Sequence, residues 1–249
     1  METLAYGKLT QSLSIPSTVT RLIIDECLYP NLDLRSFTTL NELCVLSKVN
    51  ISIPTSLKTL AIDGNVTMKD FQIPNCKCNT IDLSSFTQLT KVWTRKYVKI
   101  IYPTSIQHVY AEFISFKRKY NHGNYIMMTT PLKQIDLSSH KYIPIVETYE
   151  LMRKILPQKV GLYKTNTFHM TNNIESCEID TVDADMNQFT DFSCLKHVNK
   201  IILRNSEGIR EGYTSDVVLP SHVPILEIHG KGIYIKNKKD VIIDEFIQY

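Results

Sequence analysis

The stretch Ile53-Pro54-Thr55-Ser56-Leu57-Lys58-Thr59-Leu60-Ala61-Ile62 decides the fold of this chain. Its apolar residues stand in a fixed order, with Leu60 three positions after Leu57 and Ile62 two positions after Leu60. The last part of this triplet alternates between apolar and other residues, which is typical of a short β-strand with one buried face. The stretch therefore predicts a strand that buries Leu60 and Ile62.

Copies of this pattern recur along the chain, and internal repeats constrain a fold more than any local feature does. Triplets with the same spacing are Val19, Leu22 and Ile24; Leu40, Leu43 and Val45; Leu132, Ile135 and Leu137; Val198, Ile201 and Leu203; and Val223, Leu226 and Ile228. The proline-led element is repeated at Pro16, Pro54, Pro103, Pro157 and Pro220. One copy cannot bury both faces of a strand, whereas stacked copies bury a continuous apolar ladder, so we expect the triplets to form the core.

A second repeated element contains an aspartate close to serine. Its copies are residues 32–37, 81–86, 135–140 and, in degraded form, 190–195. The aspartate precedes a proline element by 21 residues in three successive copies: Asp33 to Pro54, Asp82 to Pro103, and Asp136 to Pro157. A fixed segment that alternates with a variable one indicates stacked coils with loop insertions on one side. We expect these aspartates, and Asp191 in the fourth copy, to hydrogen-bond their own turns rather than a row of cations.

The composition also favours strands. The chain contains 29 Ile, 15 Val and 23 Thr against only 4 Ala, an excess of β-branched residues over good helix formers. Its 8 glycines are few, but serine and aspartate can close turns without glycine. The best helix candidate is Glu147 to Leu156, where Val146, Tyr149 and Met152 stand at roughly helical spacing.

The segment Leu57 to Asn65 resembles the leucine-rich repeat family, because it reproduces the pattern Leu-x-x-Leu-x-Leu-x-x-Asn. The asparagine position of other copies holds Cys27, Phe37, Phe86, Ile114, Phe168 or Ser206. The proline and Asp-Leu-Ser-Ser-Phe elements are similar to the irregular, protist-type repeats of the BspA-like and FNIP-like groups. The resemblance covers residues 15–230. It implies a β-rich α/β solenoid, a right-handed superhelix with a parallel sheet on one side and irregular coil on the other.

The domain organisation follows from the repeats. No linker rich in proline or serine divides the chain, so residues 1–249 are expected to form a single repeat domain. Because a terminal coil must cover the open apolar stack, we expect an N-terminal cap at residues 1–14 and a C-terminal cap at residues 231–249. The solenoid then covers residues 15–230, and a final strand is predicted at Val241 to Phe246.

The cellular compartment decides how the cysteines are interpreted. Residues 1–15 lack the basic and apolar regions of a secretory signal, and no run approaches the roughly 18 apolar residues that span a bilayer. We therefore expect a cytoplasmic protein without a membrane span. The 6 cysteines are then expected as buried small apolar residues. Cys76 and Cys78 have no second ligand pair at a comparable spacing, so no metal site is predicted.

The sequence lacks the common motifs of enzyme sites. The glycines form neither a Gly-x-Gly-x-x-Gly turn nor a phosphate-binding loop, no Gly-x-Ser-x-Gly occurs, and the 7 histidines never stand as paired zinc ligands. We expect a protein without catalytic residues or cofactors. A cysteine nucleophile with a distant histidine stays open, because such partners meet only in the folded chain.

Repeat solenoids bind through surfaces that cross several coils, so the outward positions of the strands are the candidate site. These positions flank the last apolar residue of each triplet and vary among the copies, and they include Trp, Tyr and Arg, the types that dominate binding hot spots. The candidates are Trp93, Arg95, Tyr110, Glu112, Glu147, Tyr149 and Arg204. We expect them to bind an unidentified protein partner. Packing of Trp93 beneath a neighbouring loop is an equally good interpretation of that residue.

Basic clusters leave an alternative function, the binding of nucleic acid or an anionic surface. The clusters are Lys91, Arg95, Lys96 and Lys99; Lys117, Arg118 and Lys119; and Lys231, Lys236, Lys238 and Lys239. The net charge of +3 and the isoelectric point near 8.4 are below the values usual for nucleic-acid-binding domains. The sequence therefore disfavours nucleic acid as a partner, and it leaves the oligomeric state open.

Overall fold

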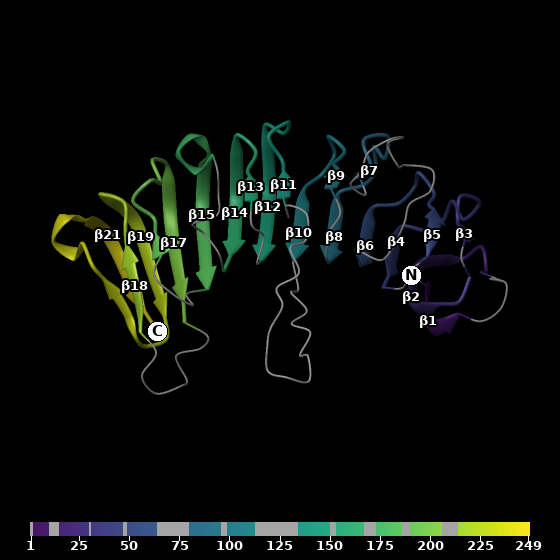
Figure 1. Cartoon of the computed structure of the whole chain (residues 1–249), viewed down its shortest axis with the longest axis horizontal. Coiled ribbons are helices and arrows are strands. Elements are labelled where there is room, and N and C mark those ends of the chain that lie inside the picture. The colour runs from purple at the N-terminus through teal and green to yellow at the C-terminus, as the bar shows by residue number, and fades with distance from the viewer. Residues whose placement is uncertain are drawn as a thin grey trace, which may run out of the picture. The chain divides into compact units, whose positions relative to one another are not determined.

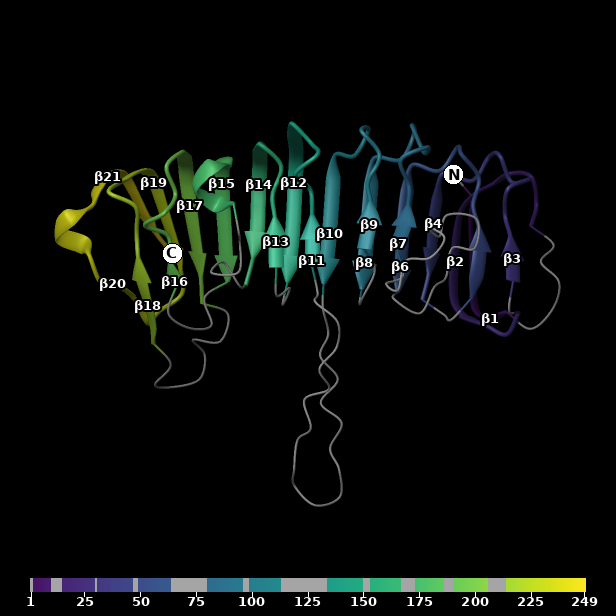
Figure 2. The same ribbon diagram turned by 45° about the horizontal axis from the view of Figure 1, so that its top comes forward.

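A computed structural model of the chain describes residues 2–9, 15–29, 31–46, 49–63, 80–95, 99–112, 134–149, 153–166, 173–185, 190–205 and 214–249. Its contacts divide the chain into two compact units, Met1–Lys133 (unit 1) and Gln134–Tyr249 (unit 2). Each unit is a stack of coils built from parallel strands, purple to teal in unit 1 and green to yellow in unit 2 (Figures 1 and 2). The predicted repeat solenoid is confirmed, whereas the single domain stays a prediction.

The long strands of unit 1 form one parallel sheet. In sheet order they are β1 (Glu2–Leu9), β2 (Val19–Cys27), β4 (Glu42–Val45), β6 (Thr59–Asp63), β8 (Lys91–Arg95) and β10 (His108–Glu112). Short strands form separate two-stranded parallel sheets: β3 (Asn31–Asp33) pairs with β5 (Asn50–Ser52), and β7 (Thr80–Asp82) pairs with β9 (Lys99–Ile101). One coil therefore consists of a long strand followed by a short strand or a connecting segment.

Unit 2 repeats this arrangement. Its long strands, in sheet order, are β12 (Tyr142–Tyr149), β14 (Lys159–Thr165), β15 (Glu178–Asp185), β17 (Val198–Arg204), β19 (His222–His229) and β21 (Ile242–Gln248). Its short strands are β11 (Gln134–Asp136) paired with β13 (Arg153–Ile155), and the row of β16 (Thr190–Asp191), β18 (Ser215–Val218) and β20 (Ile233–Ile235). The proline elements directly precede long strands, and the aspartate elements mark short ones.

The described members of the apolar triplets form the core, as their spacing predicts. In unit 1, one row of residues in register is Leu22, Leu43, Leu60, Val92 and Val109, with exposures of 0% or 1%. In unit 2 the equivalent row is Val146, Tyr163, Val182, Ile201 and Leu226, each 0% exposed. Each such side chain contributes roughly 1.5–3 kcal/mol through burial, so the stacked rows are the main source of stability.

The repeated aspartates close the turns after the short strands. The Oδ1 atom of each accepts a hydrogen bond from the backbone N–H two residues on: 3.0 Å for Asp33, 2.9 Å for Asp82, 3.0 Å for Asp136 and 2.8 Å for Asp191. The side chain and the backbone N–H of Arg35 both bond to Asp33, which lowers the pKa of that carboxyl to about 2. The predicted structural role of the aspartates is confirmed.

The α/β class predicted for the solenoid is wrong. The helical segments among the described residues are two single turns of 3-10 helix, η3 (Ile174–Ser176) and η4 (Lys238–Asp240). The side opposite the long strands carries short parallel strands rather than irregular coil alone. The physical reason is the composition: β-branched residues that alternate in and out fit extended backbone on both sides of a coil.

The helix predicted at Glu147 to Leu156 is also wrong. The residues up to Tyr149 belong to β12, and those from Arg153 to Ile155 form β13, while residues 150–152 lie outside the described part. Val146 and Thr148 are both buried, whereas Glu147 and Tyr149 are partly exposed. This period of two overrides the helical spacing of Val146 and Tyr149.

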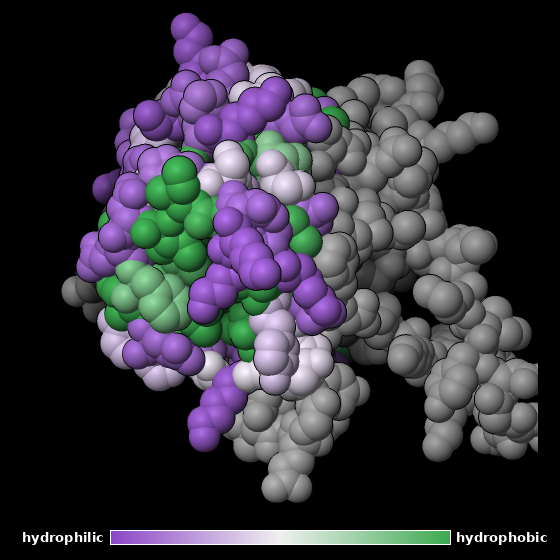
Figure 3. Space-filling view, turned by 90° about the vertical axis from the view of Figure 1, so that its left-hand side faces the viewer, coloured by the Kyte–Doolittle hydropathy of each residue, from purple (hydrophilic) through white to green (hydrophobic). Residues whose placement is uncertain are grey.

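The C-terminal segment continues both rows of strands. It contains β20, η4 and β21, and β21 includes most of the predicted strand from Val241 to Phe246. Ile242 and Phe246 are 66% and 53% exposed. Figure 3 shows apolar side chains, in green, gathered at this end of unit 2 and bordered by polar ones in purple.

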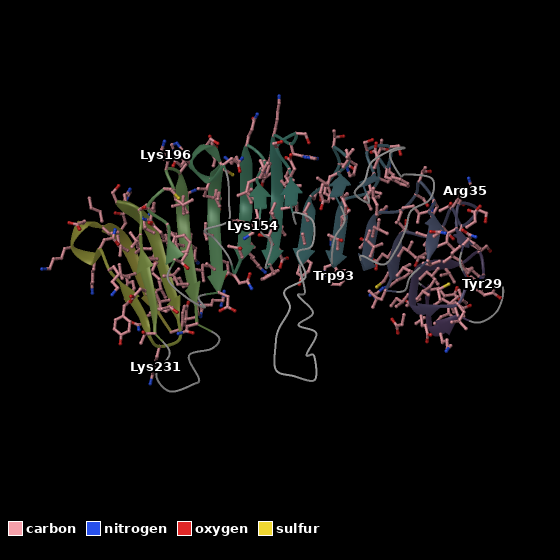
Figure 4. All side chains as sticks on the ribbon, viewed as in Figure 1. Tyr29, Arg35, Trp93, Lys154, Lys196 and Lys231 are labelled. Carbon is pink, nitrogen blue, oxygen red and sulfur yellow. The ribbon has the colours of Figure 1, made fainter. Side chains whose placement is uncertain are left out.

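An ionisable side chain lies inside unit 2. Lys154 of β13 is 0% exposed, and its Nζ donates a hydrogen bond of 3.1 Å to Oγ1 of Thr165 (Figure 4). Thr148 stands in register beside Thr165, and its hydroxyl lies 3.1 Å from the Tyr163 hydroxyl. Burial lowers the pKa of Lys154 to about 7. The core of unit 2 thus contains a polar cluster that the apolar repeat does not predict.

The cysteines follow the sequence prediction in part. Cys27 and Cys177 are buried, Cys44 and Cys194 are partly exposed, and all four are free thiols. Burial raises the pKa of Cys177 to about 12, and it also raises the pKa values of Cys44 and Cys194. High pKa values disfavour the reactive thiolate. Cys76 and Cys78 lie outside the described residues.

Candidate functional site

The outward face of the unit 1 sheet carries an apolar row, which we call the unit 1 stripe. Strand register places its members side by side across β2, β4, β6, β8 and β10: Ile23, Cys44, Ala61, Trp93 and Tyr110. All five are partly exposed. Because they alternate with the buried triplet residues, their side chains point away from the core.

The aromatic end of the stripe is formed by Trp93 and Tyr110. Their rings stack with centroids 5.4 Å apart and planes inclined by 19°. Figure 4 shows Trp93 on the long sheet of unit 1. Such a pair is worth about 0.5–1.5 kcal/mol beyond the area it buries, so each ring holds the other in place. Ala61 lies directly beside Trp93 in register, so a small side chain adjoins the large indole.

Polar residues border the stripe on the same face. The neighbouring row on this face lies two residues earlier on each strand. In this row Nε of Arg21 lies 3.3 Å from Oε2 of Glu42, and Lys91 and His108 stand in register on β8 and β10. Lys91 is exposed and His108 is partly exposed. The two remaining candidates of this unit, Arg95 and Glu112, are register partners, and their side chains lie outside the description.

The outward face of unit 2 differs, because its candidate residues belong to ion pairs and hydrogen bonds rather than to an apolar row. Glu147 of β12 faces Lys164 of β14, with Oε2 and Nζ 3.9 Å apart. The hydroxyl of Tyr149 donates to the same Oε2 at 3.4 Å. The structure thus brings two of the predicted candidates, Glu147 and Tyr149, into one hydrogen-bonded group.

The third candidate of unit 2, Arg204, belongs to a separate pair. Its Nε donates to Oδ1 of Asp183 at 2.7 Å, and this hydrogen bond is the main cause that raises the pKa of Arg204. Asp183 keeps only 13% of its side chain exposed. Removing Arg204 would leave the Asp183 carboxylate largely buried and without this partner, which is more costly than losing one side of an exposed salt bridge.

A third charged group surrounds Glu227 of β19. Lys200 and His229 both bond to its carboxylate, and Nε2 of His229 lies 2.6 Å from Oε1 of Glu227. These two bonds lower the pKa of Glu227, and the bond from Lys200 is the larger cause. The ring of His229 stacks on Tyr249 at 4.5 Å. The charges of this face therefore act mainly as cross-strand links that hold neighbouring coils in register.

Several residues of these groups were missed by sequence reasoning. Ile23, Cys44 and Ala61 are outward neighbours of recognised triplets, but their small or aliphatic side chains did not identify them as a binding surface. Asp183 was missed because its strand was not recognised. The spacing of Ile179, Val182 and Ala184 repeats the apolar triplet and could have identified β15.

Unit 2 also has an open polar hollow at the starts of its long strands. Its lining includes Lys159, Glu178, Asp180, Asn199, His197 and His222. Lys159 pairs with Glu178 at 3.5 Å, and the Asn199 amide donates to Asp180 at 2.6 Å. Since both signs of charge are present and these groups bond to each other, the hollow does not select a ligand class.

The basic clusters are only partly described. Lys117, Arg118, Lys119 and Lys96 lie outside the described residues. In the C-terminal cluster, Lys236 pairs with Asp216 at 2.9 Å, and Lys231 lies at the lower edge of unit 2 in the view of Figure 4. Within the described part of the chain, no group of three or more His, Cys, Asp or Glu could hold a metal ion.

Comparison of the chain with protein-family models, curated proteins and solved structures finds no match. Among the residues that the structure describes, no helix is long and apolar enough to cross a membrane.

Proposed function

We propose that this protein is a non-enzymatic scaffold that binds a protein partner through the unit 1 stripe. The observation that carries the proposal is the row Ile23, Cys44, Ala61, Trp93 and Tyr110, five partly exposed apolar side chains in register on one sheet face. A contiguous apolar surface bordered by polar residues is typical of a protein-binding site.

The chemistry of the border narrows the class of partner. Lys91 and His108 stand two residues before Trp93 and Tyr110 on the same strands, and so on the same face. A partner that places an aliphatic side chain over Ala61, against the Trp93 indole, and a carboxylate beside Lys91 fits both features. Electrostatic complementarity of this kind favours the correct partner and its orientation.

The unit 2 candidates have a smaller part in this proposal. Glu147 and Arg204 already bond to Lys164 and Asp183, so a partner has to replace existing ion pairs in order to use them. Trp93 and Tyr110 instead offer the partly exposed surface of two stacked rings. Rigid aromatic anchors of this type dominate the energy of most interfaces.

The repeat type and the location belong to the same proposal. We infer coils of the irregular leucine-rich type, supported by the buried Leu-x-x-Leu-x-Leu residues Leu57, Leu60 and Ile62. A cytoplasmic location is supported by the free thiols of Cys27, Cys44, Cys177 and Cys194, since a reducing compartment keeps thiols unpaired.

A photo-cross-linking amino acid in place of Ala61 tests the proposal directly. We expect the full chain to form one discrete protein adduct in native cell extract, and Trp93→Ala with Tyr110→Ala to abolish it. Tyr142→Ala is the matched control, because it removes a tyrosine that is 51% exposed in unit 2. The purified partner should then change the emission of Trp93, the single tryptophan of the chain.

Two outcomes contradict this function. Adducts that persist in the Trp93→Ala, Tyr110→Ala variant show that the stripe does not select the partner. Adducts with nucleic acid whose yield falls steeply as the salt concentration during irradiation rises support the alternative, binding through the basic clusters.

A further inference from the structure

Exposed apolar side chains are concentrated at the last coil of unit 2. Tyr234, Ile242, Phe246 and Tyr249 are 57%, 66%, 53% and 70% exposed, and all four lie on β20, on β21 or directly after it. Figure 3 shows this end of unit 2 with its apolar patch and polar border. A contiguous exposed apolar patch with a polar border usually marks an interaction surface.

The exposed end continues the core ladder. Ile243 stands in register with Val223, and Phe246 with Leu226, and both of these partners are 0% exposed. In the described part of the chain, β21 pairs only with β19, and β20 pairs only with β18. The backbone groups on the outer edges of both strands are therefore placed to pair with further strands.

The first coil of unit 1 presents the complementary edge. In the described residues β1 pairs only with β2, and it places Leu4 beside Leu22 and Tyr6 beside Ile24. Leu22 and Ile24 are 0% exposed, whereas Leu4 and Tyr6 are partly exposed. This edge therefore also ends a core ladder. The two edge strands are similar in length, with 8 residues in β1 and 7 in β21.

We propose that copies of this chain associate head to tail, with β1 of one copy pairing in parallel with β21 of the next. Parallel pairing is the geometry of every long-strand pair described above, so the added strand continues the existing sheet. It also directs Leu4 and Tyr6 toward the same side as Ile243 and Phe246, which buries the exposed ends of both ladders. This interface is separate from the unit 1 stripe and goes beyond the proposed function.

The charges favour this pairing over a symmetric contact between two β21 strands. The turn η4, just before β21, contains Lys238, Lys239 and Asp240 and so carries a net positive charge, and Glu2 begins β1. Parallel strands bring the Glu2 carboxylate to the end of the sheet that carries this positive turn. An antiparallel β21 pair centred on its middle residue instead places two Glu245 side chains face to face. Like charges directly opposite on paired strands are destabilising.

Sedimentation velocity of the full chain across a range of concentrations tests the proposal with two blocked variants. The first variant, Ile243→Lys with Phe246→Lys, blocks the β21 end, and the second, Leu4→Lys with Tyr6→Lys, blocks the β1 end. We expect the wild-type mass to rise above the monomer mass of 28.7 kDa with concentration, while each variant alone stays monomeric. An equimolar mixture of both variants should form a dimer of twice the monomer mass and nothing larger, because one intact end of each remains.

Other outcomes overturn the proposal. Wild-type protein that stays monomeric at all concentrations excludes self-association. A β1-blocked variant that still dimerises alone shows β21 pairing with itself, and a β21-blocked variant that does so shows β1 pairing with itself. The matched control Tyr142→Lys changes an exposed residue away from both edges and should associate as the wild type does.

A charge exchange keeps the test valid if a blocked variant fails to fold. Glu2→Lys alone should weaken association several-fold, because it places a lysine beside Lys238 and Lys239. Adding Lys238→Glu and Lys239→Glu to the same chain should restore it. Equal association of all three proteins contradicts the head-to-tail arrangement.

Discussion

The carboxamide of Asn237 binds the backbone of Leu219 through two hydrogen bonds. The N–H of Leu219 donates to Oδ1 at 3.0 Å, and Nδ2 donates to the Leu219 carbonyl oxygen at 2.8 Å. Asn173 makes the same pair of bonds with Leu156, at 2.8 and 2.9 Å. Both leucines precede a proline of the repeated element, whose nitrogen cannot donate. An asparagine of the next coil thus replaces the backbone partner that a short strand supplies elsewhere.

Asn237→Ala should therefore destabilise the protein by about 1–3 kcal/mol. Leu219 is 1% exposed, so its backbone N–H and carbonyl groups lose their partners without gaining water. Urea unfolding followed by circular dichroism measures the loss. Asn50→Ala is the control, since its amide bonds to Asn31 on the exposed surface and should matter far less. Equal losses in both variants contradict this role of the carboxamide.

Thr94→Val should stabilise the protein by about 1 kcal/mol. Thr94 is 5% exposed, and in the described structure its Oγ1 is buried without a hydrogen-bond partner. Valine has nearly the same shape and removes the unsatisfied hydroxyl. The matched change is Thr148→Val in unit 2, which removes a hydroxyl bonded to Tyr163 and should destabilise. Thermal unfolding should show opposite signs for the two variants, and a loss of stability in both refutes the expectation.

Gly161→Ala should destabilise unit 2 by several kcal/mol. A Cβ at this position of β14 lies 2.6 Å from the carbonyl oxygen of Pro144 in β12, which is too close for any side chain. The two strands must separate locally, and well-packed interiors resist such shifts. Gly7→Ala is the control, because a Cβ there meets nothing within 4 Å. A Gly161→Ala variant as stable as Gly7→Ala shows that the two strands separate without loss.

Sequence reasoning predicted the repeat and its buried side because those follow from spacing alone. The triplet of Leu57, Leu60 and Ile62 and its equivalents in other coils all lie in the same buried environment, so one register fits all copies. The outward positions follow from the same register, and Trp93 and Tyr110 therefore lie together as neighbours on one face. The sequence does not show that unit 2 pairs its charges, because Asp183 and Arg204 meet across strands 21 residues apart.

The errors have a common physical cause. The spacing of Val146 and Tyr149 predicts a helix although the neighbouring residues alternate, and the resemblance to leucine-rich repeats implies irregular coil on the side opposite the long strands. Short strands of two or three residues, such as β16 and β7, are too brief to show a period of their own. They form because the stacked coils bring their backbones into register, which is a tertiary effect that local patterns do not contain.

Lys154 should make the stability of the protein depend on pH from neutral to alkaline conditions. Burial lowers its pKa from 10.5 to about 7 in the folded chain, whereas the unfolded chain retains the ordinary value. Between these two values the unfolded chain binds more protons, so the free energy of unfolding rises with pH across the window from 7 to 10.5 and is lowest below it.

Lys154→Met tests this dependence, because methionine fills the same space without a charge. We expect the variant to be more stable than the wild type at pH 7 by several kcal/mol, because each unit by which burial lowers the pKa costs about 1.4 kcal/mol. The difference should shrink as the pH rises toward 10. The lost hydrogen bond to Thr165 offsets a small part of the gain. Lys159→Met, at a lysine whose side chain is 54% exposed, should leave the pH profile unchanged. Parallel profiles for wild type and Lys154→Met, measured by urea unfolding from pH 6 to 9, exclude Lys154 as the titrating group.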